Sequence, residues 1–139
     1  MYLLDTNVVS EMRKGAAGRA NPGVIKWASS VPSAAMYLSV ISAHELELGV
    51  LLAERSDPSK GRVLRAWLSD TVLPAFERRI LPIDYEVAMQ SAVFHVPDPA
   101  PYRDAFIGAT ARVHAMTVVT RNAKDFERFP DTAVLNPWE

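Results

Sequence analysis

Short apolar runs along the chain alternate with longer stretches in which apolar residues recur at helical spacing. The first pattern is typical of buried strands, and the second is typical of amphipathic helices. Strands are predicted over residues 2–4, 36–40, 79–84 (a strand or an extended connection), 116–120 and 132–136. Helices are predicted over residues 8–14, 22–30, 43–54, 58–74, 85–94, 102–115 and, as a short helix or turn, 121–129. This alternation favours a parallel sheet covered by helices.

Glycine and proline residues punctuate the pattern. Residues 15–23 predict a loop after the first helix. The amphipathic helix that begins at Pro58 is predicted to end at or before Pro74, because proline removes a helical hydrogen bond and clashes with the preceding turn. The proline-rich stretch 97–101 separates the last two long helices.

The composition fits one globular domain. With 139 residues, of which 49% are hydrophobic and 22% charged, the chain is predicted to fold as a single domain over residues 1–139. Its apolar runs are too short to span a membrane, and Asp5 interrupts the start before a signal-peptide core forms. The absence of cysteine fits a reducing compartment and excludes thiolate metal sites. We therefore expect a cytoplasmic protein with no membrane partner.

The charge balance gives no overall attraction to nucleic acid, because the formal net charge is -1. Such binding would need a local basic patch. The densest basic segments contain Arg13, Lys14, Arg19 and Lys26, and then Arg78 and Arg79. Most such runs are solvated surfaces, but the first follows Asp5 closely in sequence and would be placed to guide a phosphate backbone.

Acidic and amide side chains follow two predicted strands. Asp5 comes directly after the first strand, and Asn122 and Asp125 follow the strand 116–120. Ligands of open parallel sheets bind at the carboxyl ends of the strands, so these side chains are predicted to line a site.

Glu45 is the most informative acid on a predicted helix. At about 100° per residue it shares a stripe with apolar neighbours, where a carboxylate is costly unless it is paired or bound to a metal. That stripe contains Ile41, Leu48 and Leu52. Leu46 and Val50 form a second apolar stripe, so the buried face is not unique, and this second stripe would serve a subunit contact.

Asp104 begins a helix rich in small residues. Gly108 and Ala111 lie on the same side of that helix as Asp104, so the helix is expected to approach the sheet closely and bring Asp104 to the strand ends.

Helix capping is a structural alternative for several of these positions. Asp5, Asp104 and Asn122 would each serve as helix N-caps, with Asp125 completing a capping box.

Four such positions at one edge of a sheet favour a metal site over capping. Clustered carboxylates repel one another unless a cation neutralises them, and oxygen ligands suit Mg²⁺ or Mn²⁺. The predicted metal ligands are Asp5, Glu45, Asp104, Asn122 and Asp125.

Four segments in the same order resemble the PIN-domain ribonucleases, specifically the VapC-type toxins of bacterial toxin–antitoxin systems and their FitB-like branch. They are "LLDTNVVSE", "LSVISAHELELGV", "RDAFIGATARVHAMTVVTRNAKDFERF" and "VLNPWE". The resemblance implies a three-layer α/β/α fold and metal-dependent cleavage of RNA. It also implies a homodimer that is neutralised by a small antitoxin, through which alone the toxin would meet DNA.

The family's acids map onto Asp5, Glu45 and Asp104, and its fourth acidic position falls on Asn122 with Asp125 nearby. The resemblance therefore implies Asp5, Glu45, Asp104 and Asp125 as catalytic residues. Asn122 departs from the most acidic form of the site. A second departure is the short proline-rich segment before Asp104, where the family usually has a longer helical or glycine-containing segment. Thr6, Asn7, Thr120 and Arg121 are candidates for contacting the phosphate or supporting the ligands.

Two other functions compete with the ribonuclease. A phosphoryl-transfer domain also places an aspartate after a parallel strand, but a dehalogenase-like phosphatase would need a second aspartate where Asn7 stands. A non-catalytic scaffold that acts through antitoxin and DNA is favoured by Asn122 and disfavoured by the three retained acids.

Overall fold

The computed structural model describes residues 1–139 and contains one five-stranded sheet in the order β3-β2-β1-β4-β5. The strands are β1 (Tyr2–Leu4), β2 (Met36–Ser39), β3 (Ile80–Leu81), β4 (Thr117–Val119) and β5 (Val134–Leu135). Every neighbouring pair is parallel. The predicted parallel sheet is confirmed, and β1 lies at its centre.

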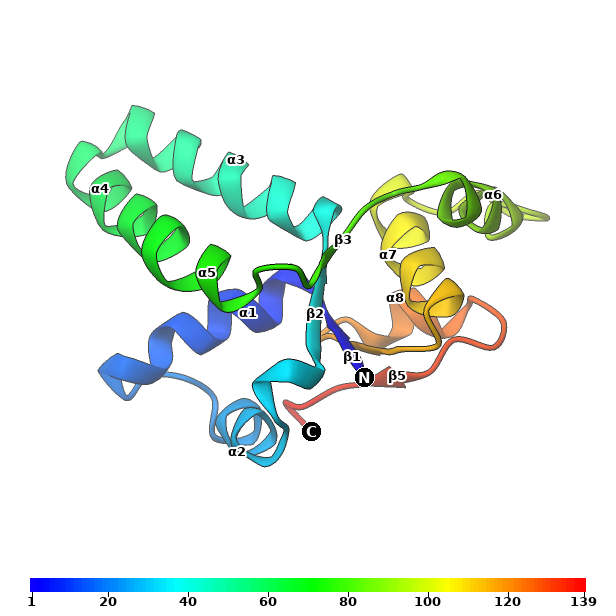
Figure 1. Cartoon of the computed structure of the whole chain (residues 1–139), viewed down its shortest axis with the longest axis horizontal. Helices are drawn as coiled ribbons and strands as arrows, with labels where there is room; N and C mark the ends of the chain where they lie inside the picture. The colour runs from blue at the N-terminus through cyan, green and yellow to red at the C-terminus, as the bar shows by residue number, and fades with distance from the viewer.

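Helices cover both faces of the sheet, which gives three layers (Figure 1). They are α1 (Thr6–Arg13), α2 (Pro22–Ser30), α3 (Val40–Ser56), α4 (Pro58–Trp67), α5 (Leu73–Ala75), α6 (Tyr85–Val93), α7 (Tyr102–Val113) and α8 (Ala123–Glu127). In Figure 1, α3 and α4 project from one side of the sheet, whereas α6 and α7 lie on the other. No helix combines the length and the apolar character that crossing a bilayer requires.

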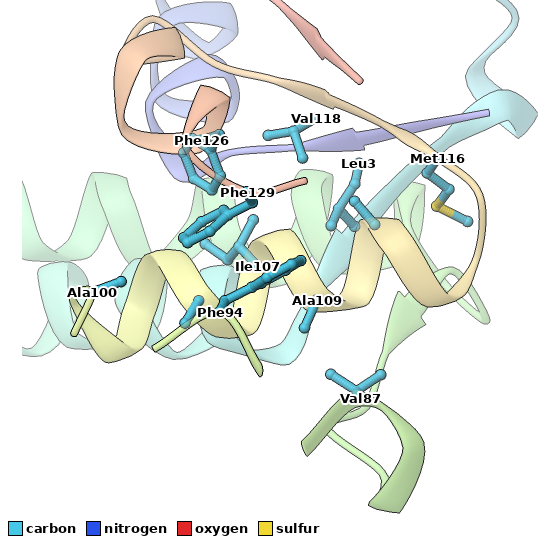
Figure 2. Packing of buried hydrophobic residues seen from close by; sticks show 12 residues of the cluster. Leu3, Val87, Phe94, Ala100, Ile107, Ala109, Met116, Val118, Phe126 and Phe129 are labelled. Carbon is cyan, nitrogen blue, oxygen red and sulfur yellow. The ribbon is translucent and has the colours of Figure 1, made fainter. Parts of the chain in front are cut away.

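The alternation of side chains along the strands produces two cores. Leu3 and Val118 face one layer, where Figure 2 shows them beside Ile107 of α7 and Phe126 of α8. The next residues along the strands, Leu4 and Val119, face the other layer and pack with residues of α1 to α4. Because both faces of β1 and β4 are buried, the positions at which these two strands end are held firmly.

The α-helix that begins at Pro58 ends at Trp67, before Pro74 as predicted, but helical structure continues through the proline. A π-helical segment, Leu68–Val72, follows α4 and leads directly into α5, which contains Pro74. The wide turn ends with the Leu73 N–H donating to the Leu68 carbonyl. Pro74 thus stands in the first turn of the next helical segment, where a missing N–H costs little.

The face of α3 that was predicted to be buried is wrong. Leu46 and Val50 are the buried residues, with 6% and 2% exposure, and they pack in the core with α1 and β2. Leu48 and Leu52, which were expected beside Glu45 on a buried stripe, are exposed. Since Leu46 and Val50 are covered within the chain, they are not free to form a subunit contact.

Candidate active site

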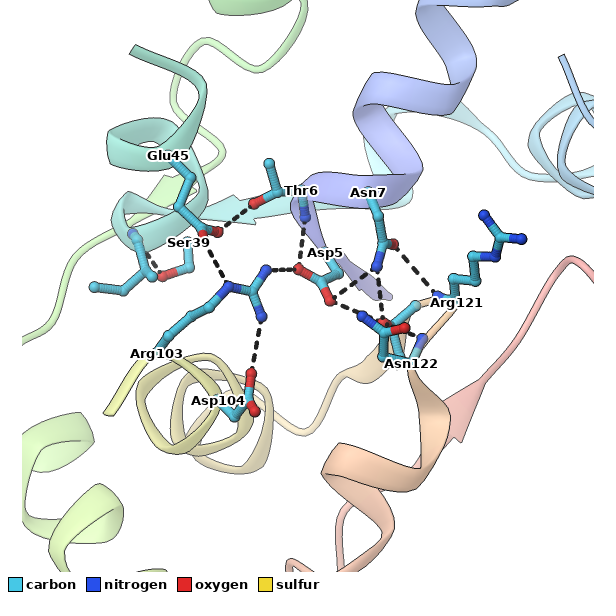
Figure 3. Close-up of polar contacts among 11 residues, drawn as sticks. Asp5, Thr6, Asn7, Ser39, Glu45, Arg103, Asp104, Arg121 and Asn122 are labelled. Atoms are coloured by element: carbon cyan, nitrogen blue, oxygen red, sulfur yellow. Dashed lines mark hydrogen bonds and ion pairs between the residues drawn. The ribbon is translucent and has the colours of Figure 1, made fainter. Parts of the chain in front are cut away.

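Asp5 stands where β1 ends and α1 begins, and its side chain is completely buried. Its Oδ1 accepts the Thr6 N–H at 2.7 Å, which makes Asp5 the N-cap of α1. Its Oδ2 accepts the Thr120 hydroxyl at 2.8 Å and lies 3.5 Å from the Asn7 amide nitrogen (Figure 3). Asp5 is therefore oriented from both the helix and the neighbouring strand, as its position after the first strand predicted.

Glu45 and Asp104 reach the same place from two helices. Glu45, on α3, accepts the Thr6 hydroxyl at 2.6 Å through Oε1. Asp104 occupies the third position of α7 and is 8% exposed. The predicted close packing of α7 is present, although Gly108 lies against Phe129 rather than against the sheet. Figure 3 shows the three acids arranged around a single guanidinium.

That guanidinium belongs to Arg103, which was not singled out from the sequence. Its Nε donates to Glu45 at 2.6 Å, and one terminal nitrogen donates to Asp104 at 2.8 Å. The other terminal nitrogen donates to Asp5. Arg103 lies outside the dense basic segments that the sequence pattern indicated. The signal that was present is its place directly before Asp104 at a helix start, beside acids that needed a counter-charge.

The turn after β4 forms the opposite wall of the site. Thr120 accepts the Asn122 N–H at 3.0 Å, and the Asn7 side-chain oxygen accepts the Arg121 N–H at 3.3 Å. A cleft of about 630 Å³ opens here, and Asp104, Asn122 and Asp125 are among its lining residues. The site thus gathers all the predicted residues at the carboxyl ends of β1 and β4.

Helix capping accounts for only one of the acids. Asp5 caps α1, but Asp104 lies inside α7, whose N-cap is Pro101. Asn122 occupies the N-cap position of α8 without a capping hydrogen bond from its side chain. Asp125 lies in the first turn of α8, and no reciprocal capping box forms with Asn122. The side chains of Asp104, Asn122 and Asp125 are therefore not explained by helix capping.

The surroundings of Asp104 oppose its ionised form, whereas those of Arg103 favour its charged form. Burial raises the pKa of Asp104, and the charges of Asp125 and Asp5 raise it further, against the lowering effect of Arg103. Burial also disfavours the charge on Arg103. The hydrogen bond to Glu45 and the charge of Asp5 outweigh that effect, so the pKa of Arg103 lies above its ordinary value.

Only part of the predicted basic segments reaches the cleft. Lys14 lines the cleft and forms a 3.1 Å ion pair with Glu11. Arg121, which was predicted separately as a phosphate contact, also lines the cleft and lies over the Trp138 ring, 5.6 Å from its centroid. Arg13 instead stacks on Trp67. Of the second pair, Arg79 donates to main-chain carbonyls, including that of Ser33 at 2.6 Å.

The donor set is chemically suited to a hard divalent cation, since it consists of carboxylate and amide oxygens without sulfur. In the present arrangement, however, the acids point at the Arg103 guanidinium. No three carboxylate or imidazole side chains converge on a common point that would hold an ion. The donor atoms are therefore of the type that binds a divalent cation, but the acids are spaced around the Arg103 guanidinium and not around an ion.

The fold and site define a three-layer α/β/α protein with an acidic cleft at the carboxyl ends of a parallel sheet. The PIN domain family model matches residues 2–132, and the chain belongs to this family. Toxin FitB of Neisseria gonorrhoeae is 40% identical over 144 aligned positions that cover 99% of each chain. VapC ribonuclease Y4jK of Sinorhizobium fredii is 33% identical, over 100% of this chain and 99% of its own.

A solved structure, that of FitAB bound to a fragment of IR36 DNA, has a chain with the same architecture. It superposes with a TM-score of 0.88 at 38% identity, covering 100% of this chain and 96% of the other. The α/β/α fold that the resemblance implied is confirmed.

Proposed function

We propose that the chain is a metal-dependent ribonuclease and acts as the toxin of a toxin–antitoxin pair. The observation that carries the proposal is the position of Asp5, a buried carboxylate held between two strand ends beside Glu45 and Asp104. Relatives that are named a VapC ribonuclease and a FitB toxin, and that align over nearly the whole chain, support the same function.

Hydrolysis of a phosphodiester needs an activated water, neutralisation of charge on the phosphate and protonation of the leaving oxygen. In the proposal, Asp5 and Asp104 hold Mg²⁺ or Mn²⁺, and Glu45, Asn122 and Asp125 complete the set of oxygen donors. The bound ion would supply a nucleophilic water at neutral pH and positive charge at the phosphate. Two ions or one would satisfy these needs.

The other residues of the site have roles that follow from their contacts. Thr6 and Thr120 orient Glu45 and Asp5 through their hydroxyls. In the proposal, Glu45, whose side chain is 30% exposed, binds the metal or orients the attacking water and accepts its proton. Asn7 and Arg121 line the cleft beside the acids and would contact the phosphate backbone.

The partners follow from the same proposal. The solved structure of FitAB bound to a DNA fragment supports a partner protein and a DNA-bound complex. In the proposal, a small antitoxin covers the cleft and carries the DNA contact. The toxin itself would form a homodimer in the cytoplasm. The non-catalytic scaffold remains the alternative, and Asn122 at an often acidic position is the feature that favours it.

A cleavage assay separates the two functions. Purified protein is incubated with end-labelled single-stranded RNA in Mg²⁺, in Mn²⁺ or in EDTA, and the products are resolved by length. The ribonuclease predicts discrete products with either metal and intact RNA with EDTA. Intact RNA under all three conditions would favour the scaffold.

A further inference from the structure

One guanidinium neutralises three carboxylates that come from three separate elements. Arg103 donates to Glu45 of α3, to Asp104 of α7 and to Asp5 at the end of β1 (Figure 3). No other lysine or arginine forms an ion pair with these acids, because Lys14 pairs with Glu11 and Arg121 stacks on Trp138. Arg103 is therefore the counter-ion of the whole cluster.

Arg103 also separates the deepest acid from the cleft. The arginine lines the cleft, whereas the Asp5 side chain has no exposed surface. A cation arriving from the cleft meets the guanidinium before it reaches Asp5. The fork of N–H groups occupies the carboxylate oxygens that a metal would use.

The side chains of Asp5 and Arg103 differ in their freedom to move. Asp5 is fixed by the Thr6 N–H and the Thr120 hydroxyl in addition to Arg103. Arg103 is the second residue of α7, its side chain is 32% exposed, and its side-chain hydrogen bonds go to the three acids alone. Rotation about its own side-chain bonds takes the guanidinium into the cleft without disturbing the helix.

We propose that Arg103 is a built-in counter-ion that occupies the acid cluster of the metal-free protein and leaves it when a divalent cation binds. The proposal rests on the proposed metal-dependent function and adds a regulatory step to the same site. Arg103 holds the acids together without metal, and it lowers the apparent affinity for metal because its contacts break first.

Calorimetric titration of Mn²⁺ into the full-length protein tests this competition. Arg103→Gln keeps much of the side-chain volume and removes the charge, so we expect its Kd for Mn²⁺ to fall by about tenfold or more, the effect of no longer breaking a charge-assisted contact. The metal-free variant is expected to melt at a lower temperature than the wild type, and added Mn²⁺ is expected to raise its Tm by more.

Arg112→Gln is the matched control. Arg112 lies on the same helix and pairs with Asp131 at 3.4 Å, away from the acids, so its variant should bind Mn²⁺ like the wild type. Equal or weaker binding by Arg103→Gln would overturn the proposal.

A measurement on the wild type covers the case in which Arg103→Gln does not fold. The Nε–H signal of Arg103, which is hydrogen-bonded to Glu45, is followed by NMR during addition of Mg²⁺. We expect it to shift and lose its protection from exchange as the backbone signals of Thr6 and Asn122 respond. An unchanged Nε–H signal with those backbone shifts present would contradict displacement.

The outcomes also separate this proposal from the proposed function. Binding of Mn²⁺ with equal affinity by wild type and Arg103→Gln removes the competition and leaves the metal site intact. Absence of binding by both proteins overturns the competition and the metal-dependent function together.

Discussion

The Thr120 hydroxyl donates to Oδ2 of Asp5 at 2.8 Å, which joins two residues 115 positions apart in the sequence. The bond closes the gap between the ends of β1 and β4, which pair in parallel through Leu4 and Val119 just before it. Both side chains are fully buried. Because Oδ1 is taken by Thr6 and Arg103, the direction of Oδ2 depends mainly on Thr120.

Thr120→Val is expected to impair catalysis more than folding. Valine keeps the shape of threonine but leaves Oδ2 with only the 3.5 Å contact to Asn7. We expect RNA cleavage to fall by about 10- to 100-fold, as for other supports of metal ligands. The free energy of unfolding is expected to fall by about 1–3 kcal/mol, since a buried carboxylate oxygen loses its donor.

Thr117→Val is the control for this substitution. Thr117 lies on β4, the strand that ends directly before Thr120, and its hydroxyl makes none of the side-chain hydrogen bonds of the site. Its variant should cleave RNA at the rate of the wild type. Equal losses of activity in the two variants would mean that the strand, and not the hydroxyl at Asp5, is responsible.

Asp104→Asn tests the electrostatics of the cluster through the pH dependence of stability. The pKa of Asp104 is raised by burial and by Asp125 and Asp5, so the folded chain keeps this proton to a higher pH than the unfolded chain. Ionisation of Asp104 therefore costs stability as the pH rises from the ordinary aspartate pKa through the raised one. Asparagine does not ionise and avoids that cost.

The measurement is urea unfolding of both proteins over a pH series. The stability of Asp104→Asn relative to the wild type should increase across that window and level off above it. A relative stability that stays constant with pH would show that folding does not raise the pKa of Asp104, and a decline would show that Arg103 stabilises the carboxylate overall.

Arg121→Ala is expected to weaken RNA binding through loss of one phosphate contact. Arg121 lines the cleft and forms no ion pair with a carboxylate, which leaves its charge available. In EDTA, where no cleavage occurs, the slope of log K against log salt concentration should become shallower by about 0.7. Arg112→Ala, on the far part of α7, should leave both the affinity and the slope unchanged.

Gly61→Ala is expected to destabilise the α3–α4 pair. A Cβ at Gly61 would lie 2.5 Å from Glu54 Cα and 2.7 Å from Glu54 N, so the helix backbones would have to separate. We expect a loss of about 1–3 kcal/mol in the free energy of unfolding. Gly49→Ala, also helical but with nothing within 4 Å of its added Cβ, should instead stabilise the protein by up to about 1 kcal/mol. A similar change in both variants would contradict the close approach.

Local signals in the sequence were sufficient to predict most of the fold. Asp5 accepts the backbone N–H of Thr6, so the helix cap that the sequence suggested after the first strand is present at the start of α1. The apolar strand runs were equally plain, because β1 and β4 are buried on both faces. These features depend on neighbours in the sequence, which is why reading the sequence recovers them.

Features set by distant contacts were not recovered. Two apolar stripes compete on α3, and only packing against α1 and β2 selects Leu46 and Val50 over Leu48 and Leu52. The place of Arg103 directly before Asp104 was only a weak local signal, because its other two partners, Asp5 and Glu45, lie 98 and 58 residues away in the sequence. Asp5 and Asp104 were found because they stand at a strand end and at a helix start, whereas Glu45 was found as a carboxylate on an apolar stripe of its helix.

The rate of RNA cleavage by Asp5→Asn, compared with that of Asp131→Asn at saturating Mg²⁺, tests the central claim most directly. Asp131 is an exposed loop residue outside the cleft, with 75% of its side chain accessible, so its change controls for loss of one carboxylate. The metal-site account predicts that Asp5→Asn loses cleavage by about 100-fold or more while remaining folded, and that Asp131→Asn cleaves like the wild type. Cleavage by folded Asp5→Asn at the wild-type rate would contradict it.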